Sequence, residues 1–207
     1  MFLLAVGGFW LWSAFSSDGL INQAVSFLEA HVRENAILAG GLFFGFATLS
    51  VLLGPFTSAP MVPVAVLLWG NGITFGLLFS GWVIGGMGAY AIGRFIGYPV
   101  VGRIVSREKV DAWREFVSRR MTFAWALLFR LAMPAETGYI FGLVRYRIGA
   151  YLLITALVEA PIAAVLVWAS DALVARDFAR FIGWIAAAIF VFAAAAYLLR
   201  ERMRRSV

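Results

Sequence analysis

An arginine, a proline and a glutamate interrupt a run of apolar residues between positions 121 and 144. They are Arg130, Pro134 and Glu136. A charge inside an apolar segment is costly unless it is paired or hydrated, and an internal proline breaks an α-helix. We therefore expect residues 121–144 to form a broken, re-entrant element that marks the functional site of a membrane protein.

The composition of the whole chain assigns it to the membrane class. Of its 207 residues, 63% are hydrophobic and only 14% are charged, whereas soluble domains are roughly 45–50% apolar and about 25% charged. A soluble chain of this length could not bury so much apolar surface. The net charge is +6. Because the basic residues cluster in short loops, this excess fits membrane topology and anionic lipid headgroups, not nucleic acid.

The sequence offers no support for a cofactor or for enzymatic activity. It has no cysteine, which excludes disulfides and thiolate metal sites. Its single histidine, His31, has no neighbouring set of metal ligands. A Ser/His/Asp set and a phosphate-binding loop are also missing from the sequence. We expect neither a cofactor nor a metal, and the protein is not expected to be an enzyme.

Apolar segments of helical length predict an all-α polytopic membrane protein with about three to four transmembrane helices. The longest segments are residues 36–54, 76–97, 148–170 and 182–199. The third would be about 34 Å long as a helix, enough for a hydrocarbon core of about 30 Å. Residues 2–15 would rise only about 21 Å as a helix, which leaves an interfacial helix and a truncated span as alternatives. Residues 20–33 have the apolar spacing of an amphipathic surface helix.

Three prolines interrupt the first half of the chain in a similar way. Pro55, Pro60 and Pro63 fall within nine positions, so no continuous helix can pass through them. Two arrangements are open: three short spans, or one hairpin over residues 36–75 that turns near the prolines. We favour the hairpin, because three prolines explain a turn better than they explain a short loop.

The basic loops set the expected orientation in the membrane. They lie at residues 94–120, 145–147 and 200–205, and the positive-inside rule places all three in the cytoplasm, together with the C-terminus. Residues 121–144 then begin and end on the same side, which again predicts a re-entrant hairpin. The first basic loop has an apolar face and a basic face, typical of an amphipathic interfacial helix. The alternative is a solvated connecting helix.

Two hairpins that enter from opposite faces form an inverted pseudo-repeat. Paired apolar segments interrupted by glycine and proline point to a binding site near the bilayer midplane. Between the two hairpins, small residues recur every four positions at Gly85, Ala89, Gly93 and Gly97. This spacing predicts close helix–helix packing along one face.

A series of motifs between residues 54 and 168 is specific in its order and spacing. The motifs are Pro60-x-x-Pro63, Gly70…Gly76, Gly85-x-x-Gly88-Ala89-x-x-x-Gly93-Arg94, Leu128-Phe129-Arg130-x-x-x-Pro134, Gly142 and Pro161. Together they resemble the DedA family, also called VTT-domain or SNARE-associated Golgi proteins. The resemblance implies two opposed re-entrant hairpins and lipid movement across the bilayer: undecaprenyl phosphate or phospholipid in bacterial members, and phospholipid scrambling in eukaryotic ones.

The chain differs from the DedA pattern at two places. Residues 36–75 contain no carboxylate, whereas typical members carry acidic residues in that hairpin. Glu136 stands where those members have a second arginine. The pattern is more similar to the VTT branch that includes yeast Golgi, plastid and bacterial proteins.

Eight residues are candidates for the transport site: Arg130, Pro134, Glu136, Tyr139, Glu159, Pro60, Pro63 and Arg94. Arg130 fits a lipid phosphate, because a guanidinium is a good phosphate partner; the alternative is a structural pair with Glu136. Glu136 fits a proton-linked group unless that pair forms. Glu159 either pairs with Arg130 or faces water. The prolines are expected to fix the hairpin turns.

These observations favour a membrane lipid transporter, similar to a flippase or scramblase, for a phospholipid or a lipid-phosphate carrier. A proton- or ion-coupled small-molecule transporter and a non-transporting assembly protein are the alternatives. We expect membrane lipids as partners, with protons as coupling ions in the second case, and the sequence is compatible with a homo-oligomer. The expected location is the cell membrane, specifically a bacterial inner membrane. Three parts are expected: residues 1–35, a membrane core at 36–170, and a C-terminal helix with a basic tail at 171–207.

Overall fold

The computed structural model describes residues 35–53, 57–97, 115, 122–132 and 137–205. These residues are helical apart from short turns, and none of them forms a strand. The elements are α3 (Ala36–Leu53), the 3-10 helix η1 (Ala59–Met61), α4 (Val62–Phe95), α7 (Phe123–Ala132), α8 (Thr137–Leu143), α9 (Ile148–Val174) and α10 (Phe178–Arg205). The predicted all-α class is confirmed.

Three helical segments are long and apolar enough to cross a membrane, and they make this a membrane-embedded protein. They are Ala36–Leu53, Ala59–Phe95 and Ile148–Val174. A shorter apolar stretch, Phe178–Ala194, begins α10. The three candidate spans are compatible with the expected helical membrane protein, and α9 continues beyond the predicted span to Val174.

The prolines and a glycine divide the first half of the chain. Pro60 lies in η1, and Pro63 lies in the first turn of α4, where a missing backbone N–H is tolerated. Within α4, Gly70 has φ 73° and ψ 174°, a conformation that is accessible to glycine and rare for other residues. α4 therefore consists of a short leg, residues 62–69, and a long leg, residues 71–95.

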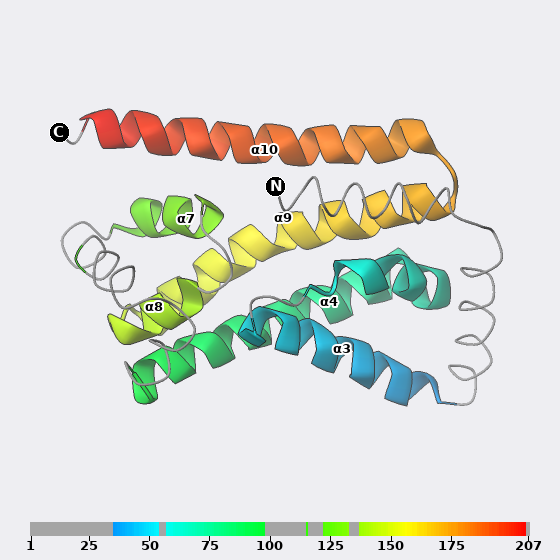
Figure 1. The fold of residues 1–207 in the computed structure, drawn as a ribbon, viewed down its shortest axis with the longest axis horizontal. Helices are drawn as coiled ribbons and strands as arrows, with labels where there is room; N and C mark the ends of the chain where they lie inside the picture. The colour runs from blue at the N-terminus through cyan, green and yellow to red at the C-terminus, as the bar shows by residue number, and fades with distance from the viewer. Residues whose placement is uncertain (1–34, 54–56, 98–114, 116–121, 133–136, 206–207) are drawn as a thin grey trace.

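The two legs of α4 run in different directions (Figure 1). α3 ends near the middle of the molecule, and the short leg returns towards the end at which α3 begins. The long leg then runs along most of the molecule. α7 and α8 lie at the opposite end, close to the C-terminus.

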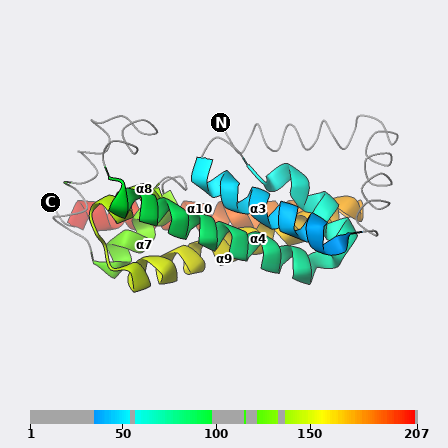
Figure 2. The same ribbon diagram turned by 90° about the horizontal axis from the view of Figure 1, so that it is seen from below.

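α4 is the central helix of the packing. It contacts α3, α8 and α9, while α10 packs on α9 and α7. Seen from below, α4 lies between α3 and α9 (Figure 2). An apolar cluster that includes Phe43, Val66, Leu78 and Val167 fills the space between α3, α4 and α9.

Glycines permit the closest helix contacts. A Cβ added to Gly85 would overlap the backbone of Thr48 in α3, and one added to Gly93 would overlap the backbone of Tyr139 in α8. Ala89, between them, is fully buried. The predicted small face is therefore confirmed at these three positions. Gly97 lies beyond the end of α4 with open space around it and a φ of +64°.

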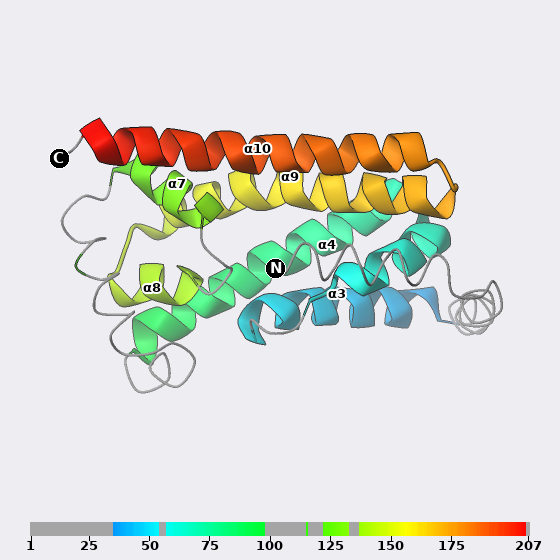
Figure 3. The ribbon, with the colours of Figure 1, turned by 45° about the horizontal axis from the view of Figure 1, so that its top comes forward.

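Charge is distributed unequally between the two ends of the molecule. The C-terminal end of α4, the turn between α8 and α9, and the C-terminal end of α10 lie at one end (Figure 3). Each of these segments carries arginines that the sequence analysis places in the cytoplasm. The turn between α9 and α10, which has both acids and arginines, lies at the other end.

Several predictions from the sequence lie outside the described residues. They concern the apolar segment 2–15, the amphipathic segment 20–33, most of the interfacial segment 94–120, and two site residues, Pro134 and Glu136.

Candidate functional site

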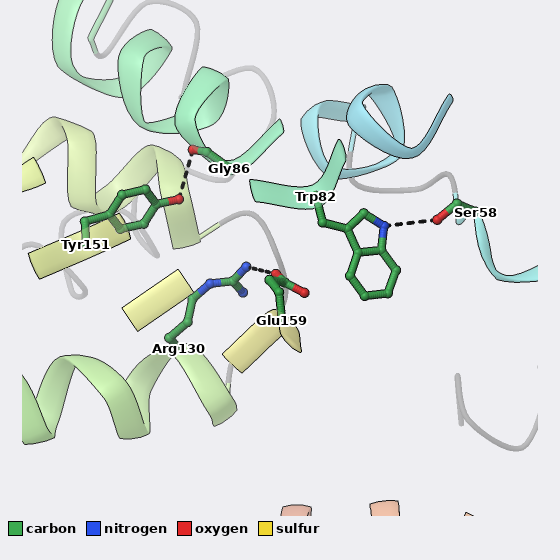
Figure 4. Close-up of polar contacts among 6 residues, drawn as sticks. All are labelled: Ser58, Trp82, Gly86, Arg130, Tyr151 and Glu159. Carbon is green, nitrogen blue, oxygen red and sulfur yellow. Dashed lines mark hydrogen bonds and ion pairs between the residues drawn. The ribbon is translucent and has the colours of Figure 1, made fainter. Parts of the chain in front are cut away.

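The site is built on a buried ion pair between two helices. Arg130, in the last turn of α7, pairs through Nη2 with Oε1 of Glu159, which lies in the middle of α9 (Figure 4). Arg130 is 4% exposed and Glu159 is 7% exposed. Of the two predictions made for Glu159, pairing with Arg130 is confirmed.

The ion pair leaves part of the arginine unused. The Nε–H of Arg130 is buried and has no acceptor among the residues that the structure describes. The hydroxyl of Thr137, the first residue of α8, is also buried without a described partner. A buried donor without an acceptor costs about 1–3 kcal/mol. Among the described residues, Arg130 therefore keeps one hydrogen-bond donor without an acceptor.

Two tyrosines, Tyr90 and Tyr151, belong to the same buried cluster as Phe129, the residue before Arg130. The rings of Tyr90 and Tyr151 stack with their centroids 5.0 Å apart. The hydroxyl of Tyr151 donates to the carbonyl oxygen of Gly86 at 2.9 Å (Figure 4). A Cβ on Gly138 would come within 2.8 Å of that hydroxyl. The absence of side chains at these two glycines thus makes room for Tyr151 between α4 and α8.

The sequence analysis missed both tyrosines. Each lies in an apolar helix, and an aromatic residue in such a helix is usually a packing residue. A weak signal was available, because a buried tyrosine normally needs a hydrogen-bond partner for its hydroxyl. Only the packed helices reveal those partners.

Tyr139, a predicted site residue, connects two distant parts of the chain. It is 2% exposed, and its hydroxyl donates to the carbonyl oxygen of Leu52 at 2.5 Å. Leu52 belongs to the last turn of α3, where carbonyl groups lack partners within the helix. Tyr139 therefore caps α3 and joins it to α8.

The predicted prolines form a separate turn. Pro63 is buried and Pro60 is exposed. Beside them, the buried Ser58 accepts a hydrogen bond of 3.1 Å from Nε1 of Trp82, which ties the turn to the long leg of α4 (Figure 4). Trp82 therefore holds the turn that contains the two prolines. This contact is separate from the ion pair that Arg130 forms with α9.

Arg94 also lies apart from the buried ion pair. Its side chain is exposed at the end of α4, where Nη1 donates to the hydroxyl of Tyr90 at 2.8 Å. The structure therefore brings together Arg130 and Glu159, and it places Tyr139, Pro60, Pro63 and Arg94 at other points. Glu136 is outside the described residues, so its pairing with Arg130 stays a prediction.

The described residues contain no cluster of metal ligands, and a hollow lies at the surface of α3 and α4. They contain no group of three or more His, Asp or Glu side chains that could hold a metal ion. A surface hollow of about 390 Å³ lies between α3 and α4, with an apolar lining that includes Phe44, Trp69 and Ile73. Its lining residues do not include Arg130 or Glu159.

Neither a protein-family model, nor a characterised protein, nor a solved structure matches this chain. The resemblance to the DedA family therefore stays an expectation from the motifs.

Proposed function

We propose that this protein moves lipids between the leaflets of a cell membrane and that Arg130 meets the lipid phosphate. The observation that carries the proposal is the buried Arg130–Glu159 pair, in which the Arg130 Nε–H has no acceptor among the described residues. Charges inside a membrane protein are rare and usually mark a substrate or ion pathway. A guanidinium also matches the geometry of a phosphate.

We further propose two opposed re-entrant hairpins, one formed by α3 with residues 62–69 and the other by α7 with α8. The short leg of α4 would rise only about 12 Å, and α7 and α8 about 15 Å and 10 Å, against a core of about 30 Å. The non-helical Gly70 and the location of the two pairs at opposite ends support this arrangement. It would form the inverted pseudo-repeat that the sequence predicts.

The proposed mechanism exchanges one anion for another on Arg130. In the resting state Glu159 neutralises the arginine. An arriving phosphate would take the unused Nε–H and then compete with the carboxylate for the remaining donors, since phosphate and carboxylate bind guanidinium in the same way. Because Glu159 returns when the phosphate leaves, the arginine is never left buried without an anion.

A second candidate function rests on Glu159 itself. A carboxylate buried in the middle of an apolar helix fits a proton- or ion-coupled transporter of a small molecule. This alternative requires Glu159 to change its protonation during transport. It predicts a flux that follows an imposed pH gradient and disappears in Glu159→Gln, whereas exchange of a lipid phosphate on Arg130 needs no gradient.

The test is lipid exchange in reconstituted vesicles. Wild-type protein should move a fluorescent phospholipid between leaflets faster than empty vesicles do, and Arg130→Ala should reduce that rate at least about ten-fold. Arg180→Ala is the matched control, because Arg180 is exposed and its partners are Asp171 and Asp177. Equal exchange by wild type and Arg130→Ala would reject the proposal.

We place the basic end in the cytoplasm and the protein in a bacterial inner membrane. The support is the collection of arginine-bearing segments at one end of the molecule together with the positive-inside rule. Labelling of single cysteines is direct in this chain, which has none of its own. A cysteine at Tyr146 should be reached only from the cytoplasmic side.

A further inference from the structure

We propose that Arg94, Arg145 and Arg147 bind the phosphate headgroup of an anionic membrane lipid at the basic end of the molecule. All three side chains are exposed. The proposal depends on the membrane location and not on lipid translocation or on Arg130. It concerns a lipid that stays at the surface of one leaflet.

Packing between α4 and α8 brings these arginines together. A Cβ on Gly142 would overlap the backbone of Tyr90 and Arg94, so the two helices are in direct backbone contact next to Arg94. The Arg94 guanidinium donates to the Tyr90 hydroxyl at 2.8 Å, and this hydroxyl donates to the carbonyl oxygen of Tyr146 at 2.5 Å. Two hydrogen bonds thus connect the Arg94 guanidinium to the backbone between Arg145 and Arg147.

The same hydrogen bonds hold Arg94 in position. The carbon of its guanidinium lies 5.9 Å from the centre of the Tyr90 ring. Only one of its donors is used by the tyrosine hydroxyl in the described contacts. The remaining donors are held in place and can bind an anion without a further loss of side-chain freedom.

The backbone at Arg145 is unusual for an arginine. Its φ is +55°, in the left-handed region where glycine is normally preferred after a helix. The turn is closed by hydrogen bonds from Arg145 N to Gly142 O at 2.9 Å and from Tyr146 N to Phe141 O at 3.0 Å. Glycine adopts this conformation more readily than arginine, so replacing Arg145 by glycine should not weaken the turn.

A comparison within the molecule shows what is distinctive about this end. Arg176 follows α9 with a φ of +56°, so it has the same backbone geometry at the opposite end. There, however, acids accompany the arginines: Arg180 lies 3.4 Å from Asp171 and 3.8 Å from Asp177. Among the described residues, neither Arg145 nor Arg147 has an acidic partner. No acid among the described residues therefore neutralises their positive charge, which can attract an external anion.

Apolar neighbours identify that anion as a lipid headgroup. Phe95, next to Arg94, is 81% exposed, and Ile148, next to Arg147, is 50% exposed. Exposed apolar side chains beside unpaired arginines match the boundary between acyl chains and phosphates. A soluble anion or a nucleic acid would make no use of these apolar side chains.

The test compares lipid retention by the full-length protein. The protein is purified in detergent micelles that contain phosphatidylglycerol or phosphatidylcholine, and native mass spectrometry counts the lipids that stay bound. Wild type should prefer phosphatidylglycerol. Each arginine near a charged surface contributes roughly a five-fold change in affinity, so Arg145→Gly combined with Arg147→Gln should weaken retention at least about five-fold.

Arg176→Gly is the matched control, because it makes the same backbone change at the opposite end. It should leave the lipid preference unchanged. Glycine tolerates the positive φ at position 145 better than arginine does. The melting temperature of Arg145→Gly should therefore be equal to or above that of wild type. An unchanged preference in the double variant, or an equal loss in Arg176→Gly, would overturn the proposal. Displacement of the lipid by millimolar inorganic phosphate would also overturn it, by revealing a site for soluble anions.

Discussion

The long leg of α4 uses the same packing device against two different neighbours. Gly85 brings it against α3, where the neighbouring cluster is apolar. Gly93 brings it against α8, where the neighbouring cluster includes Tyr90, Tyr151 and Phe129, the residue before Arg130. The comparison indicates that the α3 side is a packing surface, whereas the α8 side combines close packing with polar chemistry.

Removal of the buried carboxylate tests the polar side most severely. Glu159→Ala should lower the free energy of unfolding by about 3–5 kcal/mol, because it leaves the Arg130 charge buried without its anion. Thermal unfolding in detergent micelles measures the change. Asp171→Ala removes a partly exposed acid from Arg180 and should cost at most about 1 kcal/mol. Equal losses in the two variants would contradict the distinction between a buried pair and a surface pair.

Replacing one glycine by alanine on each side tests whether the α8 contact and the α3 contact are equivalent. Gly142→Ala on the α8 side and Gly85→Ala on the α3 side would each place a Cβ against the backbone of a neighbouring helix. Each should cost roughly 1–3 kcal/mol, the usual penalty for overpacking. We expect lipid exchange to fall in Gly142→Ala beyond the loss of folded protein, and to follow the folded fraction in Gly85→Ala. Vesicle assays normalised to folded protein would separate the two outcomes.

The hydroxyl group of Tyr139 tests the connection between α8 and α3. Tyr139→Phe removes the hydrogen bond to Leu52 and should cost about 1 kcal/mol. Unfolding should show this loss, and hydrogen exchange should rise in the last turn of α3. Tyr197→Phe, at a position that is 67% exposed, is the control and should have little effect. Unchanged exchange in α3 would show that the connection does not hold the helix end.

The smallest expected effect is a gain in stability at Gly45 of α3. A Cβ on Gly45 would have no other atom within 4 Å, so Gly45→Ala should fit without strain. Replacing a helical glycine by alanine stabilises the helix by roughly 0.5–1 kcal/mol. The melting temperature in micelles should rise slightly. A loss of stability there would mean that α3 packs more tightly along this face than the structure indicates.

The lengths and locations of the main helices could be predicted from the sequence because they depend on local composition. Apolar segments of helical length fixed the positions of α3 and α9. The spacing of Gly85, Ala89 and Gly93 placed three small residues on one helix face, which only requires the helical period. The prolines excluded a continuous helix, because a proline lacks the backbone N–H that the helix needs. This effect is local and does not depend on how the chain packs.

The contacts of the polar residues could not be predicted in the same way. Arg130 had two candidate partners: Glu136 is six positions away, and Glu159 is on another helix. Which carboxylate it meets depends on the register between α7 and α9, and a shift of one residue turns a helical side chain by about 100°. The bond from Trp82 to Ser58 depends on tertiary register in the same way.

The hydrogen bond from Tyr139 to Leu52 joins residues that are 87 positions apart in the chain. It fastens the end of α3 to the start of α8. Separation of α3 from α8 therefore requires this bond to break. The hydroxyl of Tyr139 therefore joins α3 and α8 directly. Otherwise these two helices are connected mainly because each of them packs on α4.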